Sequence, residues 1–356
     1  MKKYQIKEVK EIYNHAGSKA VEDVCSFAKE AGYEPLYIRQ RKKDTGMITL
    51  AINQFGFFAD WFKALSRAKK NSVILLQNPF KRKHLGRFFL LKLFKRLKGF
   101  KFVSVIHDVE ELRLSYYRGF STKEFNFMQK NSDYFIVHNK TMKEYFLDRG
   151  FAPESLIELG IFDYGYEPDK KIKKDEADGA DVVVAGNLEK QKCPYIYKLF
   201  KLDNPVKINL YGVNFEGDKK KSEYVNYCGA FPSEKIPAIM NGRFGLVWDG
   251  DSTDECNGDT GNYLRYNNPH KTSLYLVAGI PVIIWEKAAL AGFIKENELG
   301  ITVGSLEEIR GRLSDISDAE YDRMKKNAAE MSIRLRQGYY IKRALKECES
   351  KISNVG

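Results

Sequence analysis

The residue best suited to bind an anion is Lys271, which lies between a polar loop and an apolar segment. Asn268 is a residue type that caps helix N-termini, and Pro269 suits the first helical position, where its missing N–H is not needed. The first turn would then contain His270, Lys271 and Thr272. Unpaired amides and the positive end of the helix dipole make such a turn attractive to a phosphate. The alternative is that Pro269 and Gly279 are ordinary helix boundaries without a ligand.

A second cation that can reach a diphosphate is Lys190, in the turn Gly186-Asn187-Leu188-Glu189-Lys190 after an apolar segment. The glycine allows a ligand to approach the backbone closely, and Asn187 would lie beside it. The alternative is a simple strand-to-helix turn with a surface lysine. Tyr211 ends the next apolar segment, where it can border a nucleobase or be part of the core.

His107 and Asp108 follow an apolar segment in the first half of the chain, where they would face a cleft. A carboxylate or an imidazole in that place can deprotonate a substrate hydroxyl. Asp108 is the better candidate for the base, because a carboxylate can also orient the hydroxyl, whereas His107 can pack or contact a phosphate. Two alternatives remain open. Glu110 or Glu111 can be the base instead, and the His-Asp pair can simply cap the following turn.

The elements that must position these residues alternate between apolar strands and helices. In the first half, strands are predicted at residues 4–9, 35–38, 72–77, 102–106 and 134–138. Helices are predicted at residues 18–31, with Ser18 as the cap, at 57–65, within the basic segment 80–98, and between the last two strands. Continuous apolar strands separated by helices are typical of a parallel sheet covered on both faces.

The second half repeats this alternation after a charged segment poor in large apolar residues. Strands are predicted at residues 181–185, 206–211, 244–248 and 282–284, and helices at 193–200, 233–240 and from 318 onward, broken near 338. The predicted fold class is α/β, with two doubly wound Rossmann-like domains facing a cleft. The predicted boundaries are 1–165, 166–335, and a C-terminal helix at 336–356 that packs back on the first domain.

Several short segments carry a family resemblance through their order and spacing. They are Gln77-Asn78-Pro79, Ile106-His107-Asp108-Val109, residues 186–190, Phe244 to Asp249, Lys271, Ala278 to Ile283 and Gly338-Tyr339-Tyr340. In these segments the chain resembles a family of bacterial GT-B glycosyltransferases. That family groups β-1,6-galactofuranosyltransferase-like enzymes with the glucosyltransferase that extends O-linked N-acetylglucosamine on streptococcal serine-rich adhesins.

The resemblance implies a UDP-sugar-dependent hexosyltransferase whose first domain is the acceptor side and whose second domain binds the nucleotide sugar. Lys190 would be the donor-phosphate cation; the charge is kept where relatives can carry arginine, but the bidentate fork is lost. Gly17 and Ser18 would lie where the two domains close around donor and acceptor. Self-association of the chain is also implied.

Asp249-Gly250-Asp251 has the spacing of a metal-binding DxD motif. The same loop contains Asp254, Glu255 and Asp259, so this spacing is expected there by chance. The resemblance implies metal-independent catalysis, in which Lys271 stabilises the leaving diphosphate in place of a metal. We therefore predict no catalytic metal and no cofactor besides the UDP-sugar co-substrate, and we assign Asp249 to sugar contact.

Residues 80–98 contain a dense basic cluster and no acid. The cations assigned to a membrane-binding surface are Lys81, Arg82, Lys83, Arg87, Lys92, Lys95 and Arg96. Apolar residues between them recur at helical spacing, as in helices that lie on anionic lipid. The alternative is a crossover helix that packs on the sheet while its lysines are merely solvated. We predict an anionic membrane surface as a partner and a lipid-linked saccharide as the acceptor.

The formal net charge of +12 requires an anionic partner, which can be a nucleotide, a nucleic acid or a membrane. A hydrophobic content of 43% excludes a disordered chain. No apolar run approaches the ~18 residues of a spanning helix, and the N-terminus lacks a signal peptide, so we expect a cytoplasmic protein peripheral to the inner face of the cell membrane. The 5 cysteines lack CxxC spacing, which indicates free thiols rather than a zinc site.

These observations lead us to expect a hexosyltransferase that moves galactofuranose or glucose from a UDP-sugar to a saccharide acceptor in cell-surface polysaccharide or glycoconjugate synthesis. One alternative is a nucleic-acid-binding protein. It would interleave basic residues with stacking aromatics in a groove, whereas the densest cluster here lies on an amphipathic helix, so we expect no nucleic-acid partner. The other alternative is a catalytically inert partner subunit with the same fold.

Overall fold

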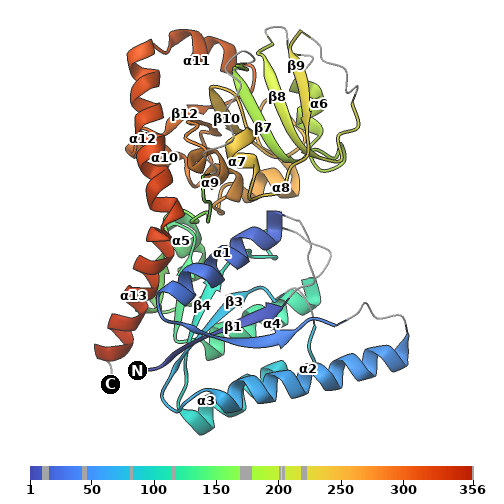
Figure 1. The fold of residues 1–356 in the computed structure, drawn as a ribbon, viewed down its shortest axis with the longest axis vertical. Coiled ribbons are helices and arrows are strands. Elements are labelled where there is room, and N and C mark those ends of the chain that lie inside the picture. Colours follow the sequence, from blue (N-terminus) through green and yellow to red (C-terminus); the bar gives the residue numbers. More distant parts are fainter. Residues whose placement is uncertain are drawn as a thin grey trace.

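The structure is a computed structural model of the chain. It describes residues 1–9, 16–41, 46–80, 83–113, 118–168, 179–199, 202, 205–217 and 223–354, without the side chains of 16–18 and 118–120. Two six-stranded sheets form an N-terminal and a C-terminal domain that lie one above the other in Figure 1. The paired strands are parallel in both sheets. The predicted α/β fold of two doubly wound domains is confirmed.

The N-terminal sheet has the strand order β2-β1-β3-β4-β5-β6. Its strands are β1 (Lys3–Val9), β2 (Glu34–Arg39), β3 (Val73–Asn78), β4 (Lys101–Ile106), β5 (Tyr134–Val137) and β6 (Leu156–Glu158). The helices between them are α1 (Ala16–Glu30), α2 (Met47–Arg67), α3 (Arg87–Lys98), α4 (Arg118–Asn131), α5 (Lys140–Asp148) and the 3-10 helix η1 (Pro153–Ser155). Every residue of β3 is buried, as expected for a strand covered by helices on both faces.

The C-terminal sheet has the order β12-β11-β10-β7-β8-β9. Its strands are β7 (Val182–Asn187), β8 (Ile208–Val213), β9 (Val225–Gly229), β10 (Phe244–Val247), β11 (Val282–Trp285) and β12 (Gly300–Val303). Its helices are α6 (Pro194–Leu199), α7 (Ile236–Ile239), α8 (Gly258–Tyr263), α9 (His270–Val277), α10 (Ala291–Glu296) and α11 (Ile309–Asp315). The strand order reverses between β7 and β10, so a crevice is expected at their carboxyl ends.

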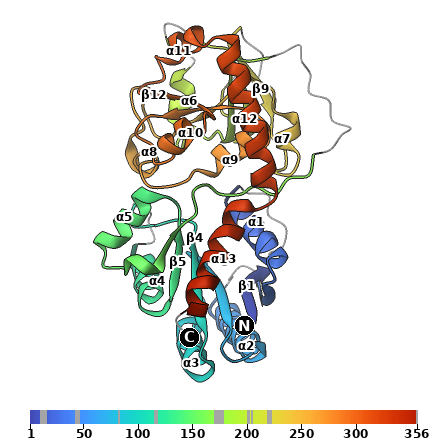
Figure 2. The ribbon, with the colours of Figure 1, turned by 90° about the vertical axis from the view of Figure 1, so that its left-hand side faces the viewer.

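Two consecutive helices connect the domains along one side of the molecule, as Figure 2 shows. They are α12 (Asp318–Arg336) on the C-terminal domain and α13 (Tyr339–Asn354) on the N-terminal domain. Gly338 separates them with φ +68°, and a Cβ there would lie 2.3 Å from the ring of Phe27 on α1. The carboxylate of Asp163 accepts hydrogen bonds from the first backbone amides of α13, and Lys3 pairs with Glu349 at 3.1 Å. Residues on α13 therefore complete the packing of the N-terminal domain.

Two expected helix starts are wrong. Helix α1 already begins at Ala16, so Ser18 lies inside its first turn and is not the cap. Helix α2 begins at Met47 instead of Phe57, and Gln54 in this additional part bonds to the backbone of Lys83 and Leu85. Among the described residues, no helix is both long and apolar enough to cross a bilayer.

Candidate functional site

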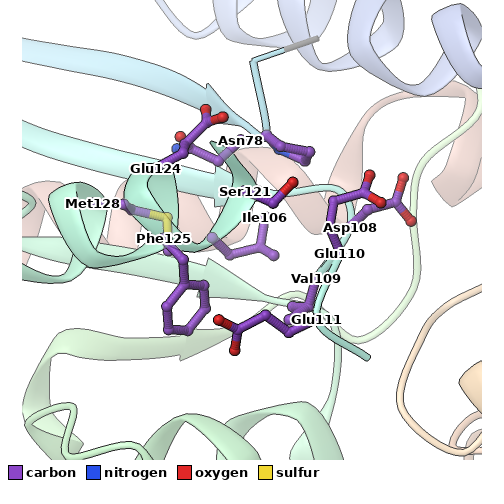
Figure 3. A pocket seen from close by; sticks show the side chains of 11 residues that line it. Asn78, Ile106, Asp108, Val109, Glu110, Glu111, Ser121, Glu124, Phe125 and Met128 are labelled. Carbon is purple, nitrogen blue, oxygen red and sulfur yellow. The ribbon is translucent and has the colours of Figure 1, made fainter. Parts of the chain in front are cut away.

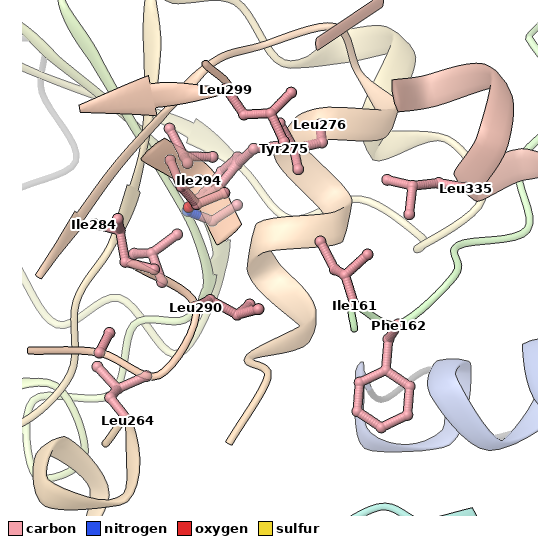
Figure 4. Packing of buried hydrophobic residues seen from close by; sticks show 14 of the residues in the cluster. Ile161, Phe162, Leu264, Tyr275, Leu276, Ile284, Leu290, Ile294, Leu299 and Leu335 are labelled. Carbon is pink, nitrogen blue, oxygen red and sulfur yellow. The ribbon is translucent and has the colours of Figure 1, made fainter. Parts of the chain in front are cut away.

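Helix α9 is held against the C-terminal sheet by Tyr275. A Cβ on Gly245 of β10 would lie 2.1 Å from the Tyr275 ring, so the glycine is what allows this close approach. The Tyr275 hydroxyl accepts a hydrogen bond from the backbone N–H of Ala185 on β7 over 2.8 Å. Tyr275 and Leu276 lie within the apolar cluster around Ile284 that Figure 4 shows. Because α9 follows β10, its first turn lies at the carboxyl edge of the sheet, beside the β7–β10 crevice.

Lys271 lies in that first turn with its side chain mostly covered. Its Nζ donates to the backbone carbonyl of Trp248 at 2.9 Å and to Oδ2 of Asp249 at 3.2 Å. Burial by itself lowers the pKa of an ammonium, but the Asp249 carboxylate more than compensates, so the pKa of Lys271 is raised above its ordinary value. The crevice therefore contains a lysine that stays charged at neutral pH.

Of the other two residues of the turn, Thr272 is buried and His270 is half-buried. The ring of His270 stacks on Tyr164 with 4.9 Å between centroids, and burial together with the charge of Lys19 lowers the pKa of His270 to about 4. The imidazole is therefore neutral at pH 7. Within the described structure, His270 Nε2 and Thr272 Oγ1 are buried without a hydrogen-bond partner, which is unusual for buried polar atoms.

Asn268 is not the N-cap of α9, and this correction changes its role. The cap position is Pro269, without a side-chain cap bond. The Asn268 Nδ2 donates to the carbonyls of His138 at 2.8 Å and Gly160 at 3.0 Å, and its Oδ1 accepts from Asn139 at 2.7 Å. Its backbone N–H donates to His138 Nδ1 at 2.9 Å. Asn268 therefore ties the entry of α9 to the N-terminal domain.

The turn after β7 brings Asn187 and Lys190 to the same edge of the sheet. The Asn187 Oδ1 accepts from the backbone N–H of Glu189 at 3.1 Å, and this bond shapes the turn. Lys190 is exposed, and its Nζ lies 5.9 Å from the centroid of the Tyr197 ring. Cys193, which the sequence did not single out, also lies here. Burial raises the pKa of its thiol to about 11, while the charge of Lys271 opposes this shift.

Tyr211 is buried, and its hydroxyl accepts a hydrogen bond from the backbone N–H of Asn241 at 3.1 Å. Of the two roles considered for Tyr211, bordering a nucleobase or being part of the core, this position fits the second. In the Asp249 loop, the backbone N–H of Asp251 donates to Asn257 at 2.9 Å while Asp249 contacts Lys271, so the two aspartates have different partners. No group of three His, Cys, Asp or Glu residues within the described ranges could hold a metal ion.

A hollow on the N-terminal domain follows β3 and β4 and is seen in Figure 3. Its wall is acidic at the mouth and apolar behind. The lining residues include Asn78, Asp108, Glu110, Glu111, Ser121, Glu124, Phe125 and Met128. The carboxylates and amides at its mouth are suitable hydrogen-bond partners for sugar hydroxyls.

His107 lies behind Asp108 and not beside it. Its Nε2 is 2.7 Å from Oε1 of Gln77, and its ring stacks on Phe162 with 5.5 Å between centroids. These contacts correspond to the packing role considered for His107. Asp108 is half-exposed at the mouth of the hollow, where its carboxylate accepts from Arg113 at 3.1 Å.

Arg113 connects the N-terminal domain to the C-terminal domain, and it was not among the residues predicted from the sequence. It contacts Asp108, and its guanidinium lies 5.9 Å from the ring of Tyr263 on α8. Burial lowers its pKa, but the charges of Asp108, Glu110 and, across the cleft, Asp249 raise it overall. The Tyr263 hydroxyl also accepts from the backbone N–H of Val109 at 2.8 Å. The loop after β4 therefore touches the C-terminal domain near Asp249.

Gly17 and Ser18 lie in the first turn of α1, and their side chains are outside the described part. The next residue, Lys19, pairs with Asp23, donates to the carbonyl of Gly165 at 2.7 Å and lies 4.5 Å from the centroid of the Tyr164 ring. Because Tyr164 stacks on His270, the start of α1 is connected to the start of α9.

The basic segment is not uniformly available to a membrane. Arg87 is buried, 3.8 Å from Glu124 and stacked on Phe80, and Lys95 pairs with Asp133 at 2.6 Å. The predictions that Arg87 and Lys95 bind a membrane are therefore corrected, because both side chains are paired with acids of the same domain. Lys81 and Arg82 lie outside the described residues. The members left exposed are Lys83, Lys92 and Arg96.

Comparison with known proteins agrees with this geometry. Residues 3–161 match the glucosyltransferase 3-like N-terminal domain, and residues 182–348 match the glucosyltransferase 3-like C-terminal domain. The chain is 36% identical to β-1,6-galactofuranosyltransferase WbbI of Escherichia coli over 258 residues, which cover 72% of this chain and 74% of the relative. It is 26% identical to glucosyltransferase 3 of Streptococcus gordonii over 315 residues, which cover 85% and 89%.

Among solved structures, HepE of Anabaena in complex with UDP and glucose superposes with a TM-score of 0.60. The superposition covers 98% of this chain and 100% of HepE at 11% identity, so it shows a shared fold. The two family matches together span most of the chain and include both sides of the cleft. This chain therefore belongs to the glucosyltransferase 3-like family of glycosyltransferases.

Proposed function

We propose that this protein transfers a hexosyl unit, galactofuranose or glucose, from a UDP-sugar to a saccharide acceptor without a metal. The observation that carries the proposal is the charged Lys271 in the first turn of α9, which is connected through Asp249 and Arg113 to Asp108 on the other domain. WbbI is named a galactofuranosyltransferase and the streptococcal relative a glucosyltransferase, which supports the two candidate sugars.

The diphosphate of the donor would bind between the first turn of α9 and the turn after β7. Two of the three Lys271 ammonium protons are directed at Trp248 and Asp249, which fixes the ammonium and leaves one donor for a phosphate oxygen. Lys190 would add a second cation from its exposed position. The unpaired Nε2 of His270 and Oγ1 of Thr272 are further polar atoms in the same turn.

The transfer step needs a base and a stabilised leaving group. Asp108 would take the proton of the acceptor hydroxyl, whose oxygen then bonds to the anomeric carbon. The bond between that carbon and the diphosphate oxygen breaks, and UDP leaves with the electron pair. Lys271 would stabilise the negative charge that develops on the leaving oxygen, a task that a metal ion performs in other glycosyltransferases.

The acceptor we propose is a saccharide on a lipid carrier, used in cell-surface polysaccharide or glycoconjugate synthesis at the inner face of the cell membrane. The acidic mouth of the hollow beside Asp108 would contact the saccharide. The exposed cations Lys83, Lys92 and Arg96 support contact with anionic headgroups, since each cation near such a surface contributes about 1 kcal/mol.

Calorimetric titration with UDP tests the donor assignment. We expect wild type to bind UDP and Lys271→Ala to bind at least about tenfold more weakly, because a charge-assisted phosphate contact is lost. Lys326→Ala, which removes an exposed lysine from α12, is the matched control and should bind like wild type. Equal affinity of the two variants would exclude Lys271 as a phosphate ligand.

Hydrolysis of UDP-galactofuranose and UDP-glucose distinguishes an enzyme from an inert subunit. We expect slow release of UDP from at least one of them, because water can replace the acceptor. Wild-type protein that binds UDP but hydrolyses neither donor, with or without saccharide acceptors, would support the inert alternative.

A further inference from the structure

Helix α2 carries a stripe of large apolar side chains that point to solvent. Its exposed members are Met47, Ile48, Leu50, Ile52, Phe55, Phe58 and Phe62, and their exposed fractions range from 40% at Phe58 to 88% at Met47. Ile48, Ile52, Phe55 and Phe62 recur at intervals of three, four and seven residues, which puts them on one side of a helix. The opposite side of α2 is buried through residues such as Phe57 and Trp61. The helix thus has two apolar sides, and only one faces the core.

Helix α3 and the loop before it extend this surface with Leu85, Phe89 and Leu97. The two helices are joined along their length. Gln54 donates to the carbonyl of Lys83 at 3.2 Å and accepts from the backbone N–H of Leu85 at 2.7 Å. Phe62 and Phe94 meet edge to face with 5.6 Å between centroids. We refer to the exposed residues of α2, α3 and residues 83–85 as the α2–α3 face.

Lys98 fixes one end of this arrangement. Its Nζ donates to the carbonyls of Leu65, Ser66 and Ala68 at 3.2, 2.6 and 2.6 Å. These carbonyls lie at the end of α2, where helix carbonyls lack helical partners. One lysine of the basic segment therefore serves as a cap, and the two helices move as a unit.

The charges on the α2–α3 face have one sign. Its exposed cations are Lys63, Arg67, Lys83, Lys92 and Arg96. Helix α3 contains no acid, and the only acid of α2 is Asp60, which is buried and paired with Arg39 at 2.6 Å and with Arg41 at 3.1 Å. A groove beside α2 is lined by Arg39, Lys63 and Arg67, so cations border the apolar stripe on the side of β2.

We propose that the α2–α3 face docks on an anionic lipid bilayer and that the stripe on α2 inserts between the lipids. An apolar stripe bordered by cations is complementary to acyl chains under anionic headgroups. A second copy of this chain fits less well, because a symmetric contact pairs the same patch on both copies and so brings the cations Lys63, Lys92 and Arg96 close to the cations of the second copy without a compensating acid. Figure 1 shows α2 and α3 on the side of the N-terminal domain that is remote from the C-terminal domain, so docking leaves the cleft free.

The orientation of α2 matters for the acceptor, and this step rests on the proposed function. In a parallel sheet, a helix that follows a strand starts at the carboxyl edge. Met47 follows β2, and Asp108 follows β4, so the inserted start of α2 lies at the same edge of the sheet as the acidic hollow. A sugar on a membrane lipid can then reach Asp108 at the mouth of the hollow while its lipid stays in the bilayer beside α2.

Sedimentation with vesicles tests the docking. The probes are phosphatidylethanolamine vesicles that contain phosphatidylglycerol, and neutral phosphatidylcholine vesicles for comparison. We expect wild type to bind the anionic vesicles at low salt. Removal of apolar area by Ile48→Ser, Ile52→Ser or Phe55→Ser should weaken binding by about tenfold each. Ile333→Ser, on an isoleucine of α12 that is 48% exposed, is the control and should leave binding unchanged.

Insertion itself is tested with an environment-sensitive fluorophore on Phe55→Cys in a Cys228→Ser background, because Cys228 is the half-exposed native thiol and the other four are buried. A blue shift with anionic vesicles is expected. Serine variants that bind like wild type, or an unshifted fluorophore on bound protein, would overturn insertion. If wild type does not bind vesicles and instead forms a dimer that the serine variants dissociate, the α2–α3 face is a protein interface. Titration with UDP does not depend on the vesicle experiments. If the wild-type protein does not bind UDP, only the proposed function is refuted.

Discussion

The backbone N–H of Asn268 donates to Nδ1 of His138 across the domain boundary, over 2.9 Å. An Nδ1 that accepts leaves the proton on Nε2, which lies 3.0 Å from the carbonyl of Ile106 and donates to it. The imidazole is therefore neutral, with its tautomer fixed by two backbone groups. Because Asn268 lies two residues before the first turn of α9, the same bond holds the start of this helix on the N-terminal domain.

This bond predicts a pH dependence that a variant can isolate. Burial lowers the pKa of His138 from 6.5 to about 4. As the pH falls below 6.5, the unfolded chain gains a proton that the folded protein does not take up, so the free energy of unfolding decreases by about 3 kcal/mol down to pH 4. His138→Gln should lack this contribution. Urea unfolding of both proteins from pH 7 to pH 4.5 should show the advantage of wild type shrinking, and a constant difference would contradict it.

Asp108→Asn should lower kcat by about 10²- to 10⁴-fold, because an amide cannot accept the proton of the acceptor hydroxyl. The affinity for UDP should stay the same, since Asp108 belongs to the acceptor side. Initial rates with a saccharide acceptor and a UDP titration measure the two effects separately. Glu110→Gln and Glu111→Gln are the controls, and a larger loss of kcat in either one would assign the base to that residue.

Lys190→Ala should weaken UDP binding by about tenfold, and Lys190→Arg should keep most of the affinity because the charge is retained. The side chain is exposed, so neither change should alter the melting temperature. Lys192→Ala removes a neighbouring lysine, which pairs with Glu189 at 2.6 Å, and provides the control. If Lys190→Ala and Lys192→Ala bind UDP equally well, the turn after β7 does not contact the diphosphate through Lys190.

Lys95→Ala should destabilise the protein by about 1–2 kcal/mol, whereas Lys92→Ala should change the free energy of unfolding by less than about 0.5 kcal/mol. Lys95 donates to Asp133 at 2.6 Å and to the carbonyl of Asn131 at the end of α4, and both contacts are partly buried. Lys92 is exposed. Urea titration at pH 7 measures both changes, and equal stabilities would mean that the Lys95 ion pair is screened like a surface pair.

The fold could be predicted because buried parallel strands such as β3 and β4 are continuous apolar runs between helices. The start of α9 was recognised within two residues, since Pro269 and Lys271 mark a helix N-terminus locally. Asn268 was assigned wrongly because its partners, His138, Asn139 and Gly160, are more than 100 positions away. A local pattern cannot distinguish a capping asparagine from one that joins two domains.

The basic segment shows the same limit of prediction from sequence, here for charged residues. Arg87 and Lys92 are both cations on an amphipathic pattern, yet one is buried against Glu124 and the other is exposed. Only the tertiary neighbours decide which of them is available. The first half of α2 was missed because its apolar residues Ile48, Ile52 and Phe55 face solvent while Asn53 is buried, so the segment lacks the apolar core face expected of a helix.

The packing of α13 on the N-terminal domain has a consequence for biosynthesis. Asp163 and Lys3 find their partners at Ile341 and Glu349, so the first domain to leave the ribosome lacks part of its own packing until the second domain has been synthesised. The packing of the N-terminal domain is complete only when α13, which follows the C-terminal domain in the sequence, docks on it. The final packing of the first domain therefore depends on synthesis of the second.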